Sequence, residues 1–340
     1  MNPWTTDLPP RLGIVVPCYN EEEVLPETVS HLSGVMNKLI ADRLIAPDSY
    51  LLFVDDGSKD RTWEQIEWYH EHYSHVRGLK LARNVGHQNA LLSGLLFAKR
   101  DADAIVSIDA DLQDDVRAIP EFVSKFREGY EIVYGVRDDR TKDSWFKRTS
   151  AQAFYKIMRA MGVDIIYNHA DFRLMSRRAV EHLGEYKEAN LFLRGIVPLI
   201  GLKSTCVTYQ RQERFAGESK YPLRKMINFA IEGITSFSVQ PIRMVTAAGG
   251  IFFVLSLVAA LYIFIVKILG KTVAGWTSIV MSIWFIGGVQ MICTGLIGEY
   301  IGKIYREVKA RPKYIIEREL VHSNDLQVKE TTFKETEYNK

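Results

Sequence analysis

Ile105–Gln113, which reads IVSIDADLQ, is the stretch from which the fold of this chain is inferred. Its first residues are apolar and β-prone and suit a buried strand, and two acids, Asp109 and Asp111, follow one residue apart. Ligands bind beyond the carboxyl ends of parallel strands, and Mg²⁺ or Mn²⁺ prefers oxygen ligands such as carboxylates and substrate phosphates. The stretch therefore predicts a metal site that faces a nucleotide diphosphate. Alone, an Asp-x-Asp is more often a solvated turn, so the rest of the chain has to decide.

The segments around this stretch alternate between strand and helix patterns. Apolar runs predict strands at 13–16, 51–54, 79–81 and 131–134, and helical patterns end near residues 40 and 73 and cover 86–99 and 119–127. This alternation predicts an α/β fold with a largely parallel sheet. No G-x-G-x-x-G follows the first strand, which counts against a dinucleotide-binding oxidoreductase.

Composition sets wider bounds. The chain has 340 residues, 47% of them hydrophobic, which is enough for one large domain or two ordinary ones. Its formal charge of +2 does not point to nucleic acid as a partner. The three cysteines, Cys18, Cys206 and Cys293, match no metal spacing and predict reduced surroundings. Residues 1–11 do not resemble a signal peptide, so we expect the chain to begin in the cytoplasm.

Two long apolar segments lie in the last third of the chain. Met244–Val266 and Trp276–Gly298 are each 23 residues without a formal charge, and about 20 apolar residues cross a bilayer core. Basic residues precede the first segment and follow the second, which places both ends in the cytoplasm by the positive-inside rule. The pattern predicts a two-helix transmembrane hairpin. A buried core hairpin of a soluble protein is the alternative.

Two basic, aromatic-rich segments precede the hairpin. Trp145–Arg159 and Tyr221–Val239 suit helices that lie at a membrane interface, or ordinary core-facing helices, and the hairpin favours the interface. The predicted organisation is a cytoplasmic catalytic domain at 1–220, an interfacial amphipathic helix at 221–243, two transmembrane helices at 244–298 and a cytoplasmic tail at 299–340.

Several short motifs accompany the acidic stretch. They are VPCYNE at 16–21, VDDGS at 54–58, GVR at 135–137, NHADFRL at 168–174 and R-x-x-G-x-S-K at 214–220. Together they resemble family 2 glycosyltransferases of the polyprenyl-phosphate type, a group similar to dolichyl-phosphate mannose synthase and to bacterial bactoprenol glucosyltransferases. The resemblance covers roughly residues 11–311 and implies a GT-A-type, mostly parallel sheet with flanking helices, followed by the membrane hairpin.

The resemblance also implies roles for individual residues. Metal ligation falls to Asp109, Asp111 and Gln113. Contacts with the donor fall to Pro17, Tyr19, Glu21, Asp56, Ala110, Arg137 and Ser219. Arg214 and Lys220 hold the diphosphate from a mobile loop and, with Asp109 and Asp111, form the catalytic set. Lys147, Arg148 and Arg173 receive the acceptor phosphate. Taken alone, the VDDGS motif is better explained by a glycine turn that caps a helix, and a structural role for Arg173 stays open.

The activity that the resemblance implies is an inverting, metal-dependent transfer of a hexose from a nucleotide sugar to a polyprenyl phosphate. UDP-glucose and undecaprenyl phosphate are the preferred pair, with Mg²⁺ or Mn²⁺ as cofactor and UDP-N-acetylglucosamine or GDP-mannose as other donors. The protein would lie in the inner (plasma) membrane as a multi-pass protein of the cell envelope, and a homo-oligomer is compatible with this. A processive polysaccharide synthase and a nucleotide-sugar sensor without activity are the competing interpretations.

Overall fold

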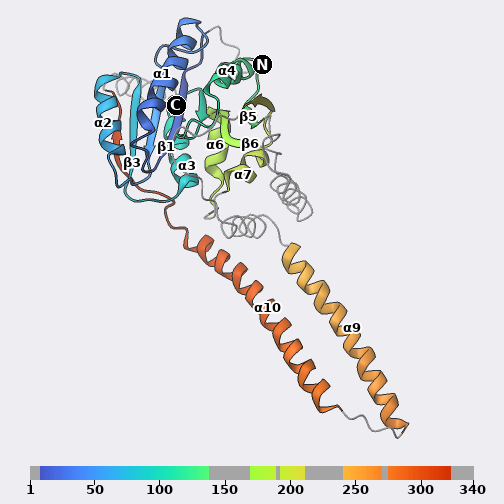
Figure 1. The fold of residues 1–340 in the computed structure, drawn as a ribbon. Coiled ribbons are helices and arrows are strands. Elements are labelled where there is room, and N and C mark those ends of the chain that lie inside the picture. The colour runs from blue at the N-terminus through green and yellow to red at the C-terminus, as the bar shows by residue number, and fades with distance from the viewer. Residues whose placement is uncertain (1–7, 138–168, 189–191, 211–239, 270–274, 323–340) are drawn as a thin grey trace, which may run out of the picture. The chain divides into compact units, whose positions relative to one another are not determined.

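The computed structural model describes residues 8–137, 169–188, 192–210, 240–269 and 275–322 (Figure 1). These residues divide into two compact units. One unit contains the described residues up to 210 together with those from Pro312 onward, and the other contains the described residues between 240 and 311.

The first unit is an α/β domain in which strands and helices alternate, as the sequence predicts. In chain order its elements are β1 (Leu12–Cys18), α1 (Leu25–Ala41), β2 (Tyr50–Asp55), α2 (Thr62–His72), β3 (Val76–Leu81), α3 (His87–Ala98), β4 (Ala104–Ser107), the 3₁₀ helix η1 (Val116–Ala118), α4 (Ile119–Arg127), β5 (Ile132–Arg137), β6 (His169–Ser176), α6 (Arg177–Glu185), α7 (Leu193–Leu199), β7 (Ser204–Tyr209) and β8 (Ile316–Leu320).

The described strands form one eight-stranded sheet in the order β7-β5-β6-β4-β1-β2-β3-β8. The central strands β4, β1, β2 and β3 are parallel, β6 is antiparallel to both of its neighbours, and β7 is parallel to β5. The chain leaves β1 for β2 on one side and later reaches β4 on the other side. The space beyond the carboxyl ends of β1 and β4 is therefore a topological switch point, where α/β sheets bind their ligands.

Helices cover both faces of this sheet (Figure 1). Helices α1, α2 and α4 pack on one face around the main apolar core, and α3 and α6 pack on the other. The strand β1 is buried on both faces, since Leu12, Ile14, Val15 and Val16 are fully inaccessible to solvent. This explains why the predicted strands read as continuous apolar runs rather than as alternating patterns.

The helix α1 shows how local sequence and packing agree. A proline stands at its first turn, Glu27 complements the positive end of the helix dipole, and Lys38 lies in the last turn. Its buried side chains recur with helical spacing; they are Leu25, Val29, Leu32, Met36 and Leu39. The mostly parallel α/β sheet with flanking helices that the sequence predicts is confirmed.

The strand β8 is not part of the predicted organisation, in which residues 299–340 are a tail. It pairs antiparallel with β3, and the side chains of Lys80 and Glu317 lie 3.3 Å apart across the two strands. A second ion pair joins Arg318 to Glu67 of α2 at 2.6 Å. The chain after α10 therefore returns to the sheet and covers the β3 edge, which would otherwise expose unpaired backbone groups.

We predict that Gly78→Ala weakens the attachment of β8. A Cβ atom at Gly78 would lie 2.8 Å from Ile66 Cγ2 and 2.9 Å from Leu320 Cδ1, so one of these side chains has to move. We expect a loss of about 1–3 kcal/mol in the free energy of unfolding and faster proteolysis within residues 310–322.

Gly34→Ala is the matched control, because nothing lies within 4 Å of a Cβ atom at Gly34 in the helix α1. It should stabilise the protein by about 0.5–1 kcal/mol through helix propensity. Equal stability and equal proteolysis of the wild type and Gly78→Ala would contradict the tight packing of β8 against β3.

The second unit consists of two long helices, α9 (Gln240–Ile268) and α10 (Trp276–Lys309), which contain the two apolar segments of the sequence. Within the described residues one stretch, Phe285–Lys309, is long and apolar enough by length and composition to cross a membrane. Large apolar side chains are exposed along both helices, among them Leu255, Ile265 and Ile292. Such an exposed apolar surface fits membrane association. The predicted interfacial segments 145–159 and 221–239 lie outside the described residues.

Candidate active site

The loops that follow β1, β2, β3 and β4 meet at the switch point of the sheet. The register places Val15 of β1 opposite Ser107 of β4, so both strands end at the same edge. The acidic stretch starts there with Asp109, two residues after β4 ends. The end of β1 supplies Pro17, and the loop after it supplies Tyr19 and Glu21, to the pocket at this edge. The sheet therefore brings together motifs that are up to about a hundred residues apart in the chain.

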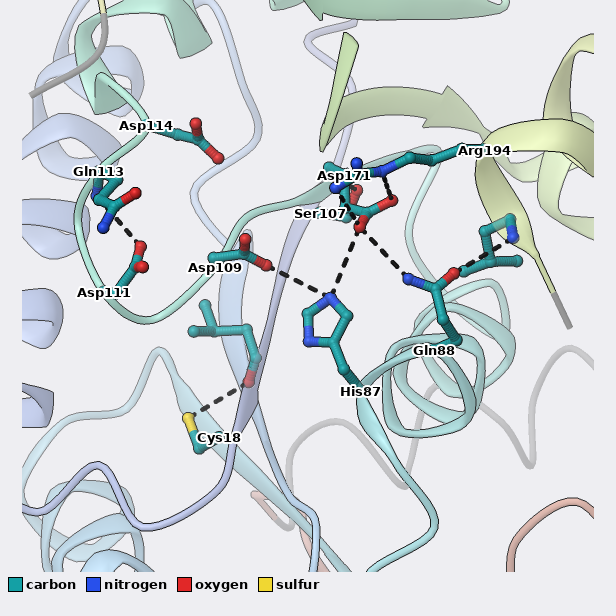
Figure 2. A network of polar contacts seen from close by, with 12 residues as sticks. Cys18, His87, Gln88, Ser107, Asp109, Asp111, Gln113, Asp114, Asp171 and Arg194 are labelled. Carbon is teal, nitrogen blue, oxygen red and sulfur yellow. Dashed lines mark hydrogen bonds and ion pairs between the residues drawn. The ribbon is translucent and has the colours of Figure 1, made fainter. Parts of the chain in front are cut away.

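The acidic loop 109–113 is held by contacts on both sides. Thr28 of α1 donates a hydrogen bond from Oγ1 to the carbonyl oxygen of Ala110 at 2.8 Å. The Gln113 backbone N–H donates to Asp111 Oδ1 at 3.2 Å, as Figure 2 shows. Between them the backbone of Leu112 has φ +55°, a conformation that residues other than glycine rarely adopt. Residues held in such conformations cluster at functional sites, where the surrounding structure maintains them.

The donor set of this loop fits a hard divalent cation. Asp109, Asp111 and Gln113 offer carboxylate and amide oxygens, and the neighbouring Asp114 has a buried Oδ2 atom without a hydrogen-bond partner among the described residues. No group of three His, Cys, Asp or Glu residues in the described part of the chain has the arrangement of a complete metal site. Proteins usually bind Mg²⁺ through one or two carboxylates, and substrate phosphates supply further ligands.

Asp109 lies in a strongly negative environment. Burial raises the pKa of Asp109, the nearby His87 lowers it, and the carboxylates of Asp171, Asp114 and Asp111 raise it, so that the pKa lies at about 6. The Nε2 atom of His87 is 3.4 Å from Asp109 Oδ1 (Figure 2). A group of carboxylates that repel one another in this way is stabilised by a positive charge placed between them.

A pocket of about 180 Å³ lies beside this loop. Its lining residues come from the end of β1, from the loops after β1, β2 and β3, and from the first turn of α3; they are Pro17, Cys18, Tyr19, Glu21, Asp56, Asn84, Gly86, His87 and Ala90. The structure therefore brings together four residues that the sequence assigns to the donor, namely Pro17, Tyr19, Glu21 and Asp56. Ala110, also assigned to the donor, is buried in the acidic loop.

Asp56 has a clear structural role in this pocket. It is 3% exposed, and its carboxylate accepts hydrogen bonds from the backbone N–H groups of Val85 at 2.7 Å and Gly86 at 3.0 Å. Gly57 follows in the left-handed region with φ +67°, and a Cβ atom there would lie 2.7 Å from Asn84 N. The VDDGS motif therefore anchors the loop before α3, and contact between Asp56 and a nucleotide stays a prediction.

Arg137 lies at the end of β5, where the sequence places a phosphate-facing arginine. Its Nη2 atom is 3.0 Å from Asp114 Oδ1, and its Nε atom is 3.3 Å from the Tyr209 hydroxyl, which also hydrogen-bonds to Asp114. Burial, the largest single cause, lowers the pKa of Arg137, but the Asp114 carboxylate and the Tyr209 side chain together raise it above its usual value, so the side chain is firmly cationic. Arg137 therefore has a carboxylate partner in this structure, and its contact with phosphate stays a prediction.

Arg173 lies in β6 as a buried residue. Its side chain is 1% exposed, and its Nη2 atom is 2.5 Å from Asp171 Oδ1. Its Nε and Nη1 atoms are buried and have no hydrogen-bond partner among the described residues. An acceptor phosphate cannot reach this guanidinium without movement of its surroundings, so the position favours the structural role that the sequence left open.

A polar network around Asp171 is the part of the site that sequence reasoning missed (Figure 2). Arg194 Nη2 is 3.0 Å from Asp171 Oδ2, His87 Nε2 is 3.8 Å from the same atom, and Gln88 Nε2 donates to it at 3.3 Å. Burial by itself raises the pKa of Asp171, but Arg194, Arg173 and His87 lower it to well below its usual range. The motif at 168–174 contains Asp171 and Arg173, and Gly86-His87-Gln88 begins a helix after a strand, but neither pattern indicates that Arg194 joins them.

Five predicted site residues lie outside the described residues: Lys147 and Arg148 of the acceptor set, and Arg214, Ser219 and Lys220 of the donor loop. Their roles stay predictions.

Comparison with known proteins is consistent with this site. Residues 13–184 match Glycosyl transferase family 2, and residues 240–304 match the GtrB C-terminal hairpin. The chain is 59% identical over 311 residues to the uncharacterized glycosyltransferase YkoT of Bacillus subtilis (strain 168), covering 92% of each chain. It is 41% identical to a bactoprenol glucosyl transferase of Shigella phage SfII and 40% identical to a prophage bactoprenol glucosyl transferase homolog of Escherichia coli (strain K12), covering 91% of this chain and 98% and 99% of the relatives.

This protein belongs to glycosyl transferase family 2 and is a glycosyltransferase. Within that family it carries the GtrB C-terminal hairpin, and its relatives with bactoprenol glucosyl transferase names match along most of the chain. The resemblance inferred from the motifs is therefore confirmed.

Proposed function

We propose that this glycosyltransferase transfers glucose from UDP-glucose to undecaprenyl phosphate with inversion at the anomeric carbon, and that it requires Mg²⁺ or Mn²⁺. The observation that carries the proposal is the oxygen-donor loop of Asp109, Asp111 and Gln113 beside the pocket lined by Pro17, Tyr19 and Glu21. The acceptor is supported by relatives whose names describe bactoprenol glucosyl transfer, at about 40% identity along chain and hairpin together.

The chemistry needs positioning more than it needs a base. A phosphate monoester has a second pKa near 6 and is largely dianionic at neutral pH, so it attacks without losing a proton. A phosphate oxygen forms the bond to the anomeric carbon while the bond from that carbon to the diphosphate breaks, and the electron pair leaves with UDP. A divalent cation held by Asp109, Asp111 and Gln113 would offset the charge that develops on the leaving diphosphate.

The remaining parts of the chain have roles in the same proposal. Arg214, Ser219 and Lys220 close over the donor diphosphate, because guanidinium and ammonium groups bind phosphate oxygens well. Arg137, which contacts Asp114, also contacts the same diphosphate when the donor is bound. The helices α9 and α10 cross the membrane as a hairpin, and the sheet domain faces the cytoplasm, since basic residues flank both ends of the hairpin.

The proposal is tested with the full chain in lipid nanodiscs that contain undecaprenyl phosphate. Radiolabelled UDP-glucose, UDP-N-acetylglucosamine and GDP-mannose are supplied separately, each with Mg²⁺ or Mn²⁺, and the lipid fraction is separated by chromatography. We expect a lipid-linked monosaccharide from UDP-glucose, one label per lipid, with the opposite anomeric configuration to the donor.

Other outcomes separate the competing interpretations. A product that grows to several sugars would indicate a processive synthase. Binding of a nucleotide sugar without any labelled lipid, for all three donors and both metals, would indicate a sensor and would reject the proposed function.

A further inference from the structure

The carboxylate of Asp171 forms ion pairs with two arginines, and only one of the two has a side chain that is accessible to a ligand. Arg173 contacts Asp171 Oδ1 from inside the domain with its side chain 1% exposed, whereas Arg194 contacts Asp171 Oδ2 with its side chain 36% exposed. Asp171 itself is 4% exposed, so its single negative charge is enclosed between them. The two guanidinium groups therefore share one carboxylate, and the accessible one belongs to Arg194.

The Arg194 guanidinium is held in place rather than free to move. Its Nε and Nη2 atoms contact the two Asp171 oxygens at 3.3 and 3.0 Å, which is a bidentate arrangement. Gln88 joins the same carboxylate to α7, because its Nε2 donates to Asp171 and its Oε1 accepts from the Leu193 backbone N–H at 3.2 Å. The residue next to Arg194 is therefore fixed to the first turn of α3.

This cation lies next to the acidic loop, on the side away from Asp111 and Gln113. His87 links the two regions, since its Nε2 atom is 3.4 Å from Asp109 Oδ1 and 3.8 Å from Asp171 Oδ2. Figure 2 shows Asp111 and Gln113 on one side of Asp109, and His87 and Arg194 on the other. In-line displacement needs the attacking group and the leaving diphosphate on opposite faces of the anomeric carbon. If the diphosphate lies on the side of Asp111, the attacking group therefore approaches from the side of Arg194.

We propose that Arg194 binds the phosphate group of the acceptor lipid and is fixed for that purpose by Asp171. A fixed, planar guanidinium with N–H donors beyond the two that Asp171 accepts among the described residues suits the oxygens of a phosphate dianion. The assignment rests on the proposed function, and it puts an accessible arginine of α7 in the role that the motifs suggested for the buried Arg173. The chemistry that Arg194 recognises, a phosphate oxygen, is shared by the acceptor and by the donor diphosphate, so the test has to separate the two.

The test compares Arg194→Gln, Arg194→Lys and the wild type, each as the full chain in nanodiscs with undecaprenyl phosphate and UDP-glucose varied independently. For Arg194→Gln we expect KM for the lipid phosphate to rise about 10- to 100-fold, the effect of losing a charge-assisted hydrogen bond. KM for UDP-glucose and the binding of UDP should stay within about twofold of the wild type. Arg194→Lys keeps the charge but not the planar pair of donors and should lie between the two.

Arg178→Gln is the matched control. Arg178 is a half-exposed arginine whose Nη1 is 2.9 Å from Glu131 Oε1, remote from the network, and its loss should leave both KM values unchanged. A wild-type KM for lipid phosphate in Arg194→Gln, or an equal rise in both KM values, overturns the assignment while the proposed function stands. Absence of any lipid product from the wild type rejects the proposed function and this assignment with it.

Discussion

Asp111→Asn is expected to reduce sugar transfer at least about 100-fold while the protein keeps its fold. The substitution removes one negative charge from the acidic loop but keeps an oxygen that can accept the Gln113 N–H. If Asp111 helps to hold a divalent cation against the diphosphate, its loss removes several kcal/mol of transition-state stabilisation, and each 1.36 kcal/mol is a factor of about ten in rate. Transfer rates are measured at several Mg²⁺ and Mn²⁺ concentrations, and folding is followed by thermal unfolding.

The matched control for this prediction is Asp115→Asn on the same loop. Asp115 accepts hydrogen bonds from the Arg117 backbone and guanidinium and caps η1, so it is occupied structurally. Its amide variant should retain transfer. Full activity of the wild type in excess chelator, or of Asp111→Asn at any metal concentration, would show that the acidic loop does not act through a metal.

Asp171→Ala is expected to lower the free energy of unfolding by about 3–5 kcal/mol, because it leaves the charge of Arg173 buried without a carboxylate. Two nitrogen atoms of this guanidinium already lack hydrogen-bond partners among the described residues. Urea denaturation of the full chain in mild detergent, followed by tryptophan fluorescence, measures the loss. Glu128→Ala, which breaks the exposed pair with Lys125, should cause little change. Equal effects of the two substitutions would show that Asp171 does not stabilise the core around β6.

The contribution of Asp171 should also depend on pH in one direction. Its folded pKa lies below the unfolded value of about 3.9, so its stabilisation is complete above about pH 4 and is lost only as pH falls through the folded pKa. Between about pH 5 and 7 the stability difference between the wild type and Asp171→Asn also includes the protonation of Asp109, whose pKa of about 6 is raised in part by Asp171. Below about pH 4 the difference should shrink as the folded protein loses the Asp171 charge. A difference that grows as the pH falls below 4 would contradict the ion pairs assigned to Asp171.

Local sequence was sufficient to predict a strand wherever its burial follows from a short run of apolar residues. The runs that become β1, β2 and β4 are buried on both faces, so each is apolar throughout and visible without partners. The strand β8 was not predicted because three of its five residues are consecutive charged residues, Glu317, Arg318 and Glu319, and only pairing with β3 makes it a strand. Its ion pair joins Lys80 to Glu317, 237 residues apart, a distance over which no local pattern carries information.

The sequence by itself determined the family, the acidic loop at the end of a strand, and the hairpin, because each is encoded in residues that are neighbours in the chain. The tertiary structure decided which side chains share the site. It placed β1 beside β4, committed Asp56 to the backbone of Val85 and Gly86, buried Arg173, and exposed Arg194 next to Asp171, 23 residues earlier in the chain. These outcomes depend on strand order and on competition for one buried carboxylate, and both are settled only when distant segments pack together.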